Sequence, residues 1–406
     1  MTVRVNRSRV TEGKIRSSQS GFTMVELLLG TFLASVISLA VFSMFVTSSD
    51  YYGRQLDLTQ AQSSLRFASE YLKSELRDIG RLSVMSTDLR VRDPQYCGAL
   101  QYRGIELKDN DPGGDNYQVN QALIRNNIAP DRLRLLLDVS GGSPLYLRSV
   151  NGTSLTLAPT VDQPTIEARR LTGIGAAARF TQLFDDYSLT RITNLSTGLY
   201  DVIPTSSAQL VNGVGQITLS NAPCLALACE SATCVANPIH WVEYAVLTNE
   251  TNPERSHLAR RRLSLEDGTP LDRGNLIIAD YIVDFQVWGQ YDTRGQSSIN
   301  IGERSIGLAP QVPDDEDIKD DRGNWDKSQN EESRLDKWAH RLRGLNIVLA
   351  ARAARVDPKL TLDLNTEEMG PQERSSLLLE RSPETGRAYV STLMSLIDTP
   401  NLYRGD

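Results

Sequence analysis

The sequence has few of the residues and motifs on which most catalytic sites depend. Its three histidines, His240, His257 and His340, are scattered along 406 residues and lie in no H-E-x-x-H motif. It has no G-x-S-x-G elbow and no Walker A loop, and the segment GIGAAAR, residues 173–179, lacks the βαβ context of a dinucleotide site. We interpret that segment as a loop or a packing site for small residues. We predict no catalytic residue, no cofactor and no metal, and therefore no enzymatic role.

Positive charge is not in excess either. The chain carries 43 Lys and Arg against 50 Asp and Glu, a formal net charge of −7, which does not indicate a chain-wide basic surface for nucleic acid. A local patch could still form from Arg260, Arg261 and Arg262 together with Arg169 and Arg170. Alternation along a strand would split the run of three between two faces. We therefore favour a solvated, ion-paired strand and predict no nucleic-acid partner.

Cysteine is scarce and occurs only well after the hydrophobic N-terminal run. The four cysteines are Cys97, Cys224, Cys229 and Cys234. The last three have the spacing C-x4-C-x4-C, which is not a usual zinc spacing and has no histidines to complete it. If this part of the chain lies outside the cytoplasm, the even number favours disulfides over free thiols, with three possible pairings that the sequence leaves open.

Long hydrophobic runs are absent, with one exception. Residues 27–46 carry no formal charge over 20 positions, close to the ~20 that cross about 30 Å of hydrocarbon as a helix. A signal peptide fits poorly, because its apolar region is about 7–15 residues long and ends in small residues. We predict a transmembrane helix over residues 22–46. The mostly basic residues before it keep the N-terminus in the cytoplasm by the positive-inside rule. They are Arg4, Arg7, Arg9, Lys14 and Arg16, opposed only by Glu12.

The helical period continues beyond the apolar run. Apolar residues recur at spacings of 3 and 4 with charged residues between them, which predicts an amphipathic helix over residues 53–79 that Gly80 could cap. Residues 22–79 can therefore form one helix of about 87 Å, which Gly53 could bend. The apolar stripe consists of Leu58, Ala61, Leu65, Ala68, Leu72, Leu76 and Ile79.

The start of this helix resembles a known family. The motif SGFTMVELL, residues 20–28, follows a basic leader and opens a long hydrophobic helix. It resembles the N-terminus of type IV pilins and of the pseudopilins of type II secretion, in which a prepilin peptidase cuts after the glycine on the cytoplasmic face. The resemblance implies a leader over residues 1–21, a cut between Gly21 and Phe22, N-methylation of Phe22, and a role for Glu26 in setting the register of assembly.

Glu26 needs a partner. A lone carboxylate in hydrocarbon costs several kcal/mol unless it is paired or reaches the interface. Cleavage would create an ammonium at Phe22, with which Glu26 could pair in the same subunit or in a neighbour during assembly. The alternative is that Glu26 extends to the membrane interface, since it lies near the helix start. The surrounding pattern favours the pair.

Beyond residue 80 the sequence changes to apolar stretches separated by Gly, Pro, Asn and Asp, without a repeat of 20–50 residues. SVNGTS, residues 149–154, indicates a hairpin with a two-residue Asn-Gly loop. We predict an α+β fold in which the long N-terminal helix packs on a mainly antiparallel β-sheet head, residues 81–406, with large insertions. Strands are expected at 132–139, 144–150, 153–158, 215–220, 240–248, 258–266, 281–291 and 342–353.

Residues 308–338 are dense in charge and poor in aliphatic residues, which predicts an exposed loop leading to a short helix at about 330–340. Its acidic residues could coordinate Ca²⁺, but their spacing matches no defined calcium loop, so we favour a solvated loop. We likewise interpret Asp109, Asp111 and Asp115 as turn residues. The acidic residues of the longer loop are Asp314, Asp315, Glu316, Asp317, Asp320 and Asp321.

The order of segments in the second half of the head extends the resemblance. IHWVEYAVLT, SHLARRRLSLE, LIIADYIVDFQVWGQYDTRG and LRGLNIVLAARAARV follow one another between residues 239 and 356. They are similar to the C-terminal region of PilW-type minor pilins, which are related to the J-type pseudopilins of type II secretion. The stretch 81–239 resembles nothing that we can name.

This resemblance implies a structural minor pilin that joins other minor pilins and the major pilin to prime type IV pilus assembly, with a place at the pilus tip beside an adhesin. It implies an inner-membrane prepilin with a periplasmic head, an extracellular pilus after assembly, and roles in cell adhesion and twitching motility. Two alternatives stay open, a J-type pseudopilin of a type II secretion system and a binding module for DNA uptake.

Overall fold

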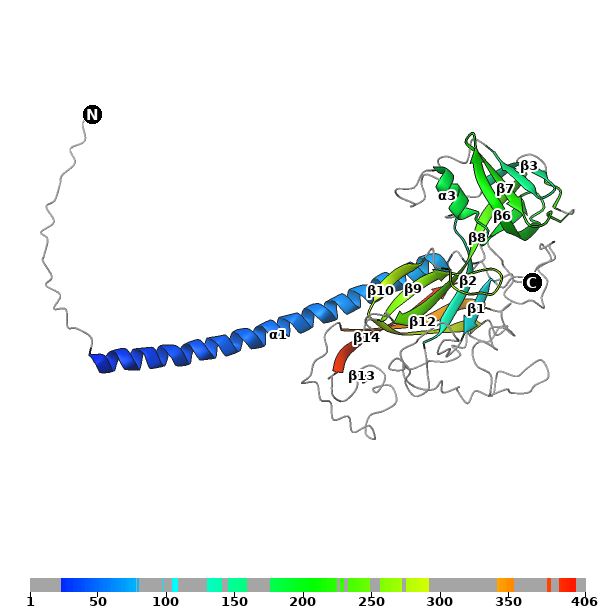
Figure 1. Ribbon diagram of the computed structural model, residues 1–406. Helices are drawn as coiled ribbons and strands as arrows, with labels where there is room; N and C mark the ends of the chain where they lie inside the picture. Colours follow the sequence, from blue (N-terminus) through cyan, green and yellow to red (C-terminus); the bar gives the residue numbers. More distant parts are fainter. Residues whose placement is uncertain are drawn as a thin grey trace, which may run out of the picture. The chain divides into compact units, whose positions relative to one another are not determined.

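The computed structural model describes residues 23–77, 79, 97, 104–108, 130–140, 145–158, 176–224, 227–229, 233–248, 256–271, 275–291, 342–353, 378–380 and 387–398. The chain divides into two compact units, Met1–Gln55 and Leu56–Asp406. The long helix α1, Met24–Leu76, contributes to both units, and the strands belong to the second (Figure 1).

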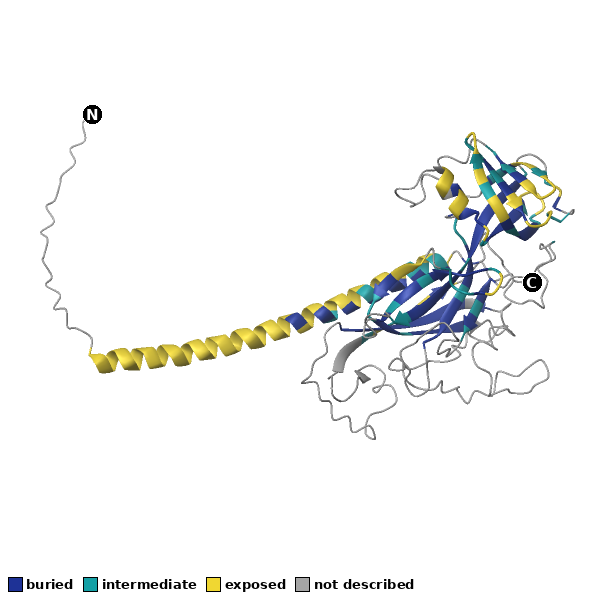
Figure 2. Ribbon diagram, in the orientation of Figure 1, coloured by how far each residue is buried: buried dark blue, intermediate teal, exposed yellow. Residues whose placement is uncertain are grey.

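Helix α1 is unbroken over 53 residues and continues through Gly53. In the first unit, every residue of the segment 23–55 except Gly53 is exposed, including all the large apolar side chains (Figure 2). Nothing in the first unit therefore covers these side chains. The predicted long helix is confirmed over this range.

In the second unit, α1 buries one face. The apolar stripe that the sequence predicts is confirmed, because Leu65, Ala68, Leu72 and Leu76 are almost fully buried and Leu58 is partly buried. These residues pack in one hydrophobic core with strands from two sheets. The spacing of 3 and 4 puts them on one side of the helix, so the helix supplies a continuous ridge to that core.

One part of the larger sheet has the strand order β1-β2-β8-β9-β10, with every pair antiparallel. Alternation along β2 and β8 points Leu133, Leu135, Val242 and Tyr244 into the core that contains α1. The opposite face carries charged side chains. The strands are β1 Ile105–Lys108, β2 Arg132–Asp138, β8 Cys234–Thr248, β9 Ser256–Arg262 and β10 Leu276–Asp280.

The rest of the larger sheet closes on itself. The order β8-β3-β4-β7-β6-β5 returns to its start because β5 also pairs with β8, which makes a ring of six antiparallel strands that we call the barrel lobe. Its own core includes Phe180 of helix α3, Ala176–Leu183, and Phe184 just after it. Closure leaves no free edge in this ring. The strands added here are β3 Leu145–Asn151, β4 Ser154–Leu157, β5 Ser188–Asn194, β6 Tyr200–Val211 and β7 Val214–Leu219.

Two tight hairpins fix the register of the barrel lobe. The predicted hairpin between β3 and β4 is confirmed, but its two-residue loop is Gly152-Thr153 and not Asn151-Gly152, because Asn151 pairs with Ser154 and Gly152, at φ 56°, takes the first loop position. The hairpin between β6 and β7 has Asn212 at φ 51° and Gly213 at φ 79°. Two consecutive positive φ angles define a type I′ turn, for which Asn-Gly is the preferred sequence.

A separate four-stranded sheet completes the core around α1. Its order is β11-β12-β14-β13, again antiparallel throughout. Phe285, Ile347 and Ile397 from this sheet pack in the same core as the α1 stripe. The hydroxyls of Ser69 on α1 and Ser395 on β14 lie 2.7 Å apart. The strands are β11 Ile282–Tyr291, β12 Leu342–Arg352, β13 Leu378–Glu380 and β14 Arg387–Asp398.

The α+β class is confirmed, with one long apolar N-terminal helix and a largely antiparallel head. All eight predicted strand segments contain a strand, but β1, β5, β6, β10, β13, β14 and the first half of β8 were not among them. The interpretation of residues 173–179 as a loop is wrong from Ala176 onward, where α3 begins. The leader 1–21, Gly80, the turn 109–115, the loop 308–338 and the helix at 330–340 lie outside the described residues.

Candidate functional site

The first turn of α1 is closed by a reciprocal pair of hydrogen bonds. The backbone N–H and the Oγ1 hydroxyl of Thr23 each donate to Oε2 of Glu26 at 3.1 Å. The backbone N–H of Glu26 lies 3.3 Å from Oγ1 of Thr23 and donates to it. This is a capping box, in which the residue before the helix and the third helical residue satisfy one another. The sequence signal for this capping box is T-x-x-E at residues 23–26.

The capping box supplies a local partner for Glu26. Its carboxylate accepts two hydrogen bonds and lies at the positive end of the α1 dipole, and both effects favour an anion there. The bond to Thr23 therefore offsets part of the cost of a carboxylate beside an apolar run. Gly21 and Phe22 lie outside the described residues, so the pair between Glu26 and an ammonium at Phe22 stays a prediction.

The segment after Glu26 has the properties of a membrane span. Among the described residues, α1 is the one helix long and apolar enough to cross a bilayer, and none of its most apolar stretch is buried. Hydroxyls within this segment donate to backbone carbonyls: Thr31 to Leu28 at 3.0 Å, Ser35 to Phe32 at 2.7 Å and Thr47 to Ser43 at 2.9 Å. These hydroxyls are satisfied within the helix itself, as hydrocarbon requires.

The arginine triplet of β9 is paired inside the protein. Arg260 reaches Glu75 of α1, with Nε 3.2 Å from Oε2, and Arg261 reaches Glu243 of β8, with Nη2 2.5 Å from Oε2. Arg262 makes a bidentate ion pair with Asp185, in which Nη1 lies 2.6 Å from Oδ2. The expected ion pairing is confirmed, but the expectation of a solvated strand is wrong, because Arg261 and Arg262 are only 7% and 6% exposed. The charges of these two side chains are therefore not accessible to a ligand at the protein surface.

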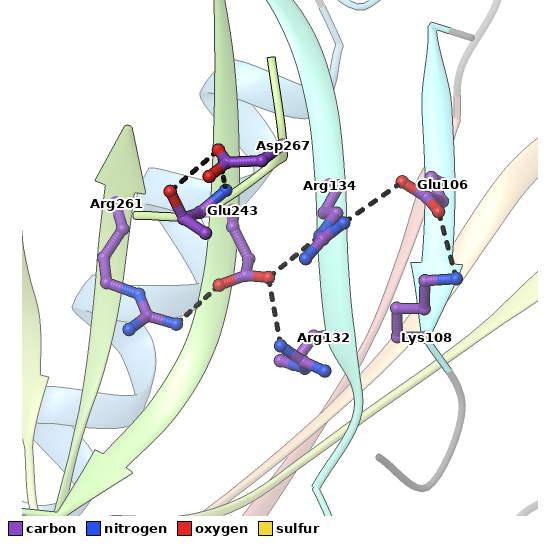
Figure 3. Close-up of polar contacts among 8 residues, drawn as sticks. Glu106, Lys108, Arg132, Arg134, Glu243, Arg261 and Asp267 are labelled. Atoms are coloured by element: carbon purple, nitrogen blue, oxygen red, sulfur yellow. Dashed lines mark hydrogen bonds and ion pairs between the residues drawn. The ribbon is translucent and has the colours of Figure 1, made fainter. Parts of the chain in front are cut away.

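Charges alternate in a row across four strands. Glu106, Arg134, Glu243 and Arg261 stand directly opposite one another on β1, β2, β8 and β9, in the order negative, positive, negative, positive (Figure 3). We call this row the charge ladder. Opposite charges at facing positions stabilise this register of strand pairing, because a shift by one residue would put these side chains on opposite faces of the sheet.

Glu243 is the centre of the charge ladder. Its side chain is fully buried, and three guanidinium groups surround it: Arg261 at 2.5 Å, Arg134 at 3.0 Å and Arg132 at 3.6 Å. Burial lowers the pKa of Arg132, Glu243 opposes that effect, and Arg134 and Arg261 add to it. The carboxylate therefore holds together three cations that would otherwise repel one another.

A loop after β9 lies against this face. The guanidinium of Arg134 stands over the ring of Trp241, 5.6 Å from its centroid. Gly268, at φ 68°, sits so close that a Cβ there would come within 3.1 Å of the Trp241 ring. In the same loop, the carboxylate of Asp267 accepts hydrogen bonds from the N–H of Thr269 at 3.1 Å and its hydroxyl at 2.8 Å. The described contacts of this polar region serve folding.

The histidines occupy unrelated positions. His240 is buried on β8, and its Nε2–H donates to the carbonyl oxygen of Leu183 at 2.9 Å. Burial lowers the pKa of His240 well below its ordinary value, and the nearby Arg262 lowers it further, so the imidazole is neutral. His257 is half-buried on β9, and His340 lies outside the described residues. The expectation that the histidines are strand or surface residues holds for the strand positions of His240 and His257.

The four cysteines form two disulfides in the barrel lobe. Cys97 pairs with Cys224, which is 127 residues away in sequence, and Cys229 pairs with Cys234, which is 5 residues away. The structure thus selects one of the three pairings that the sequence left open. All four cysteines pack against the core of the lobe.

Asp201 lies beside the first disulfide. One of its carboxylate oxygens is within 4.8 Å of the sulfurs of Cys97 and Cys224, a cluster of metal-ligand types. The two sulfurs are bonded to each other, however, so neither is a thiolate that could bind a metal. The Asp201 oxygens accept the N–H of Val202 at 2.8 Å and of Cys224 at 2.9 Å. These bonds give Asp201 a structural role.

Comparisons of the chain with protein-family models, with curated proteins and with solved structures found no match. The described residues include an apolar N-terminal helix suited to a membrane, and this helix continues into the core of an antiparallel head. The head contains disulfides and buried ion pairs.

Proposed function

We propose that the chain is a minor pilin of a type IV pilus. In this proposal, a prepilin peptidase cuts between Gly21 and Phe22, Phe22 is N-methylated, and the mature subunit joins other minor pilins and the major pilin to prime assembly. The role is structural, and the chain is the substrate of the processing enzymes. The head lies in the periplasm before assembly and on the extracellular pilus, at its tip, afterwards.

The observation that supports this most directly is the change of environment along α1. One continuous helix is exposed and apolar through residue 46 and then buries a stripe that begins at Ala61. A soluble protein would not expose so large an apolar surface, whereas a helix that first lies in lipid and later among neighbouring helices must do so. The motif at residues 20–28 precedes this helix where the proposal needs it.

Glu26 and the small residues after it suit contact between helices. Gly30 and Ala34 follow Glu26 at intervals of four, so the three lie on one side of α1. Gly30 has no side chain, and nothing lies within 4 Å of the position that a Cβ would take. Small residues let helices approach closely in lipid. In the assembled state, the Glu26 carboxylate would pair with the ammonium of Phe22 and thereby set the axial register of the subunit.

The rival functions have less support. A J-type pseudopilin would share the helix, the cut and the register residue, and the partner proteins would distinguish it. Binding of DNA through Arg260, Arg261 and Arg262 is disfavoured, because all three are engaged by carboxylates of the same chain. An adhesin and the other minor pilins remain the proposed partners of the head.

An assembly assay tests the proposal. In cells that lack the native gene, the unchanged chain should restore pili, Gly21→Ala should remain uncut in the membrane, and Glu26→Gln should be cut but should not restore pili. Glu26→Asp, which keeps the charge, should restore them in part. Glu70→Gln is the matched control, because Glu70 lies on the exposed side of the same helix. Normal piliation with Glu26→Gln, or restored type II secretion in place of pili, would contradict the proposal.

A further inference from the structure

The aromatic residues of α1 in the first unit are sorted by chemistry along the helix axis. Phe32, Phe42 and Phe45 lie within the charge-free stretch, and Tyr51 and Tyr52 lie beyond it. The two tyrosines are 65% and 70% exposed. Phenylalanine has no polar atom, whereas the tyrosine hydroxyl needs water or another polar group. The order therefore runs from rings suited to hydrocarbon to rings suited to an interface.

The polar groups place the edge of the hydrocarbon just before the tyrosines. Thr47 donates its hydroxyl to the carbonyl of Ser43, so it can lie in an apolar environment. Asp50 carries the first formal charge after Glu26. A charge is costly in hydrocarbon, so the boundary falls between Thr47 and Asp50.

The length of the helix agrees with this boundary. At 1.5 Å per residue, Tyr51 lies about 36 Å along α1 from Leu27. A bilayer has about 30 Å of hydrocarbon and about 40–45 Å when both headgroup layers are included. Helical side chains tilt toward the N-terminus, which directs the tyrosine rings back toward the lipid. With Leu27 at the inner boundary, the rings of Tyr51 and Tyr52 fall in the outer headgroup layer.

We propose that Tyr51 and Tyr52 form the outer interfacial anchor of α1, binding the glycerol and headgroup layer of the leaflet opposite Glu26. This inference rests on the membrane insertion contained in the proposed function. Tyrosine is enriched at this depth because its ring is apolar at one end and polar at the other. Asp50 and Arg54, which flank the pair, have opposite charges, so the anchor does not require anionic lipid. Together with Glu26, the tyrosines fix the depth of the helix in the bilayer.

The chain permits a clean test with introduced cysteines. All four native cysteines are in disulfides, so one new cysteine is the only free thiol under oxidising conditions. Ser43→Cys, Val46→Cys and Ser49→Cys would be prepared in the full chain, inserted into phosphatidylcholine vesicles, and labelled from outside with a membrane-impermeant maleimide. With both tyrosines present, the labelling rate should rise steeply, by at least tenfold, between Val46→Cys and Ser49→Cys.

The tyrosine variants decide between the outcomes. Replacing both tyrosines, Tyr51→Ala with Tyr52→Ala, should reduce the ratio of the labelling rate at Ser49→Cys to that at Val46→Cys at least fivefold. The reason is that the helix can then slide or tilt in the bilayer. Tyr51→Leu with Tyr52→Leu should reduce this ratio as well, since leucine lacks the polar end, whereas Tyr51→Trp with Tyr52→Trp should restore it. A steep rise that survives both the alanine and the leucine changes would overturn the anchor alone. Equal labelling at Ser43→Cys and Ser49→Cys in the otherwise unchanged chain would overturn both the anchor and the membrane span.

Discussion

The two units of the chain use apolar and charged side chains in opposite ways. In the first unit, the large apolar residues of α1 are exposed and the one carboxylate near the helix start is held by its neighbour Thr23. In the second unit, apolar residues fill a core and charged residues such as Glu243 are buried among partners from other strands. The apolar side chains of the first unit thus have no cover within that unit, whereas the second unit buries its apolar residues in a core and pairs buried charges such as Glu243 within itself. Substitutions should therefore change insertion or assembly in the first unit and folding in the second.

The largest effect on folding is expected at Glu243. Glu243→Gln removes the carboxylate that three arginines share and leaves their charges buried, which should cost about 3–5 kcal/mol of unfolding free energy. Denaturant titration of the full chain in detergent would measure the loss. Glu70→Gln is the control, because the exposed Glu70–Lys73 pair should contribute less than about 0.5 kcal/mol. Equal effects of the two changes would show that the charge ladder does not stabilise the head.

The two parts of α1 can be compared directly with one type of substitution. Leu72→Ala removes a fully buried side chain from the core and should cost about 2–5 kcal/mol of unfolding free energy. Leu39→Ala, at a position 74% exposed in the first unit, should leave the unfolding midpoint of the head unchanged. Thermal unfolding followed by the near-ultraviolet signal of the head would separate them. A loss of head stability with Leu39→Ala would contradict the division of the chain into two units.

Membrane insertion should depend on substitutions in the first unit and not on those in the second. Leu33→Arg places a charge in the apolar segment and should disfavour insertion by about 2.5–3.5 kcal/mol. Phe67→Arg is the matched control, because Phe67 is also exposed, at 59% against 52% for Leu33, but lies in the second unit. The fraction of chain resistant to carbonate extraction would be measured. Loss of insertion with Phe67→Arg, or its survival with Leu33→Arg, would contradict the assignment of the span.

The smallest expected effect is a pH dependence confined to the second unit. Burial and Arg262 lower the pKa of His240 in the folded protein, while the unfolded chain titrates near the ordinary value of about 6.5. The unfolded state therefore binds more protons below that pH, and stability, complete above about pH 6.5, falls as the pH drops, by at most about 1.4 kcal/mol per unit. His240→Gln should remove this slope between pH 6.5 and 5, and His257→Gln should keep it. Unfolding curves at several pH values would show the difference.

Local patterns predicted the parts of the fold that depend on local physics. The stripe from Ala61 to Ile79 follows from its spacing of 3 and 4, and the Asn-Gly signal located the β3–β4 hairpin to within one residue of its loop. The same signal marks the β6–β7 hairpin at Asn212 and Gly213, which was not among the predicted turns. Strand β6 contains Pro204, and β8 contains Pro238 after Asn237, and both sequences favour a turn when considered alone.

The polar part of the candidate site was less accessible from the sequence. Pairing of Arg261 with Glu243 depends on the register of β8 and β9, and pairing of Arg262 with Asp185 joins residues 77 positions apart. No local spacing encodes such contacts. The sequence of Arg260, Arg261 and Arg262 is therefore the same whether the strand is exposed or buried. The disulfide between Cys97 and Cys224 is similar, because its two residues meet only when the barrel lobe closes. The capping box at Thr23 and Glu26, by contrast, was readable from four residues.

The proposed processing of the first unit is the central claim, and it can be measured directly. Intact mass and N-terminal sequencing of the membrane-extracted chain would be compared between cells with and without prepilin peptidase. The account predicts a chain that begins at methylated Phe22 only when the peptidase is present, and an uncut chain with Gly21→Ala. A chain that still begins at Met1 in the presence of the peptidase, or one cut after Val46, would contradict the pilin assignment.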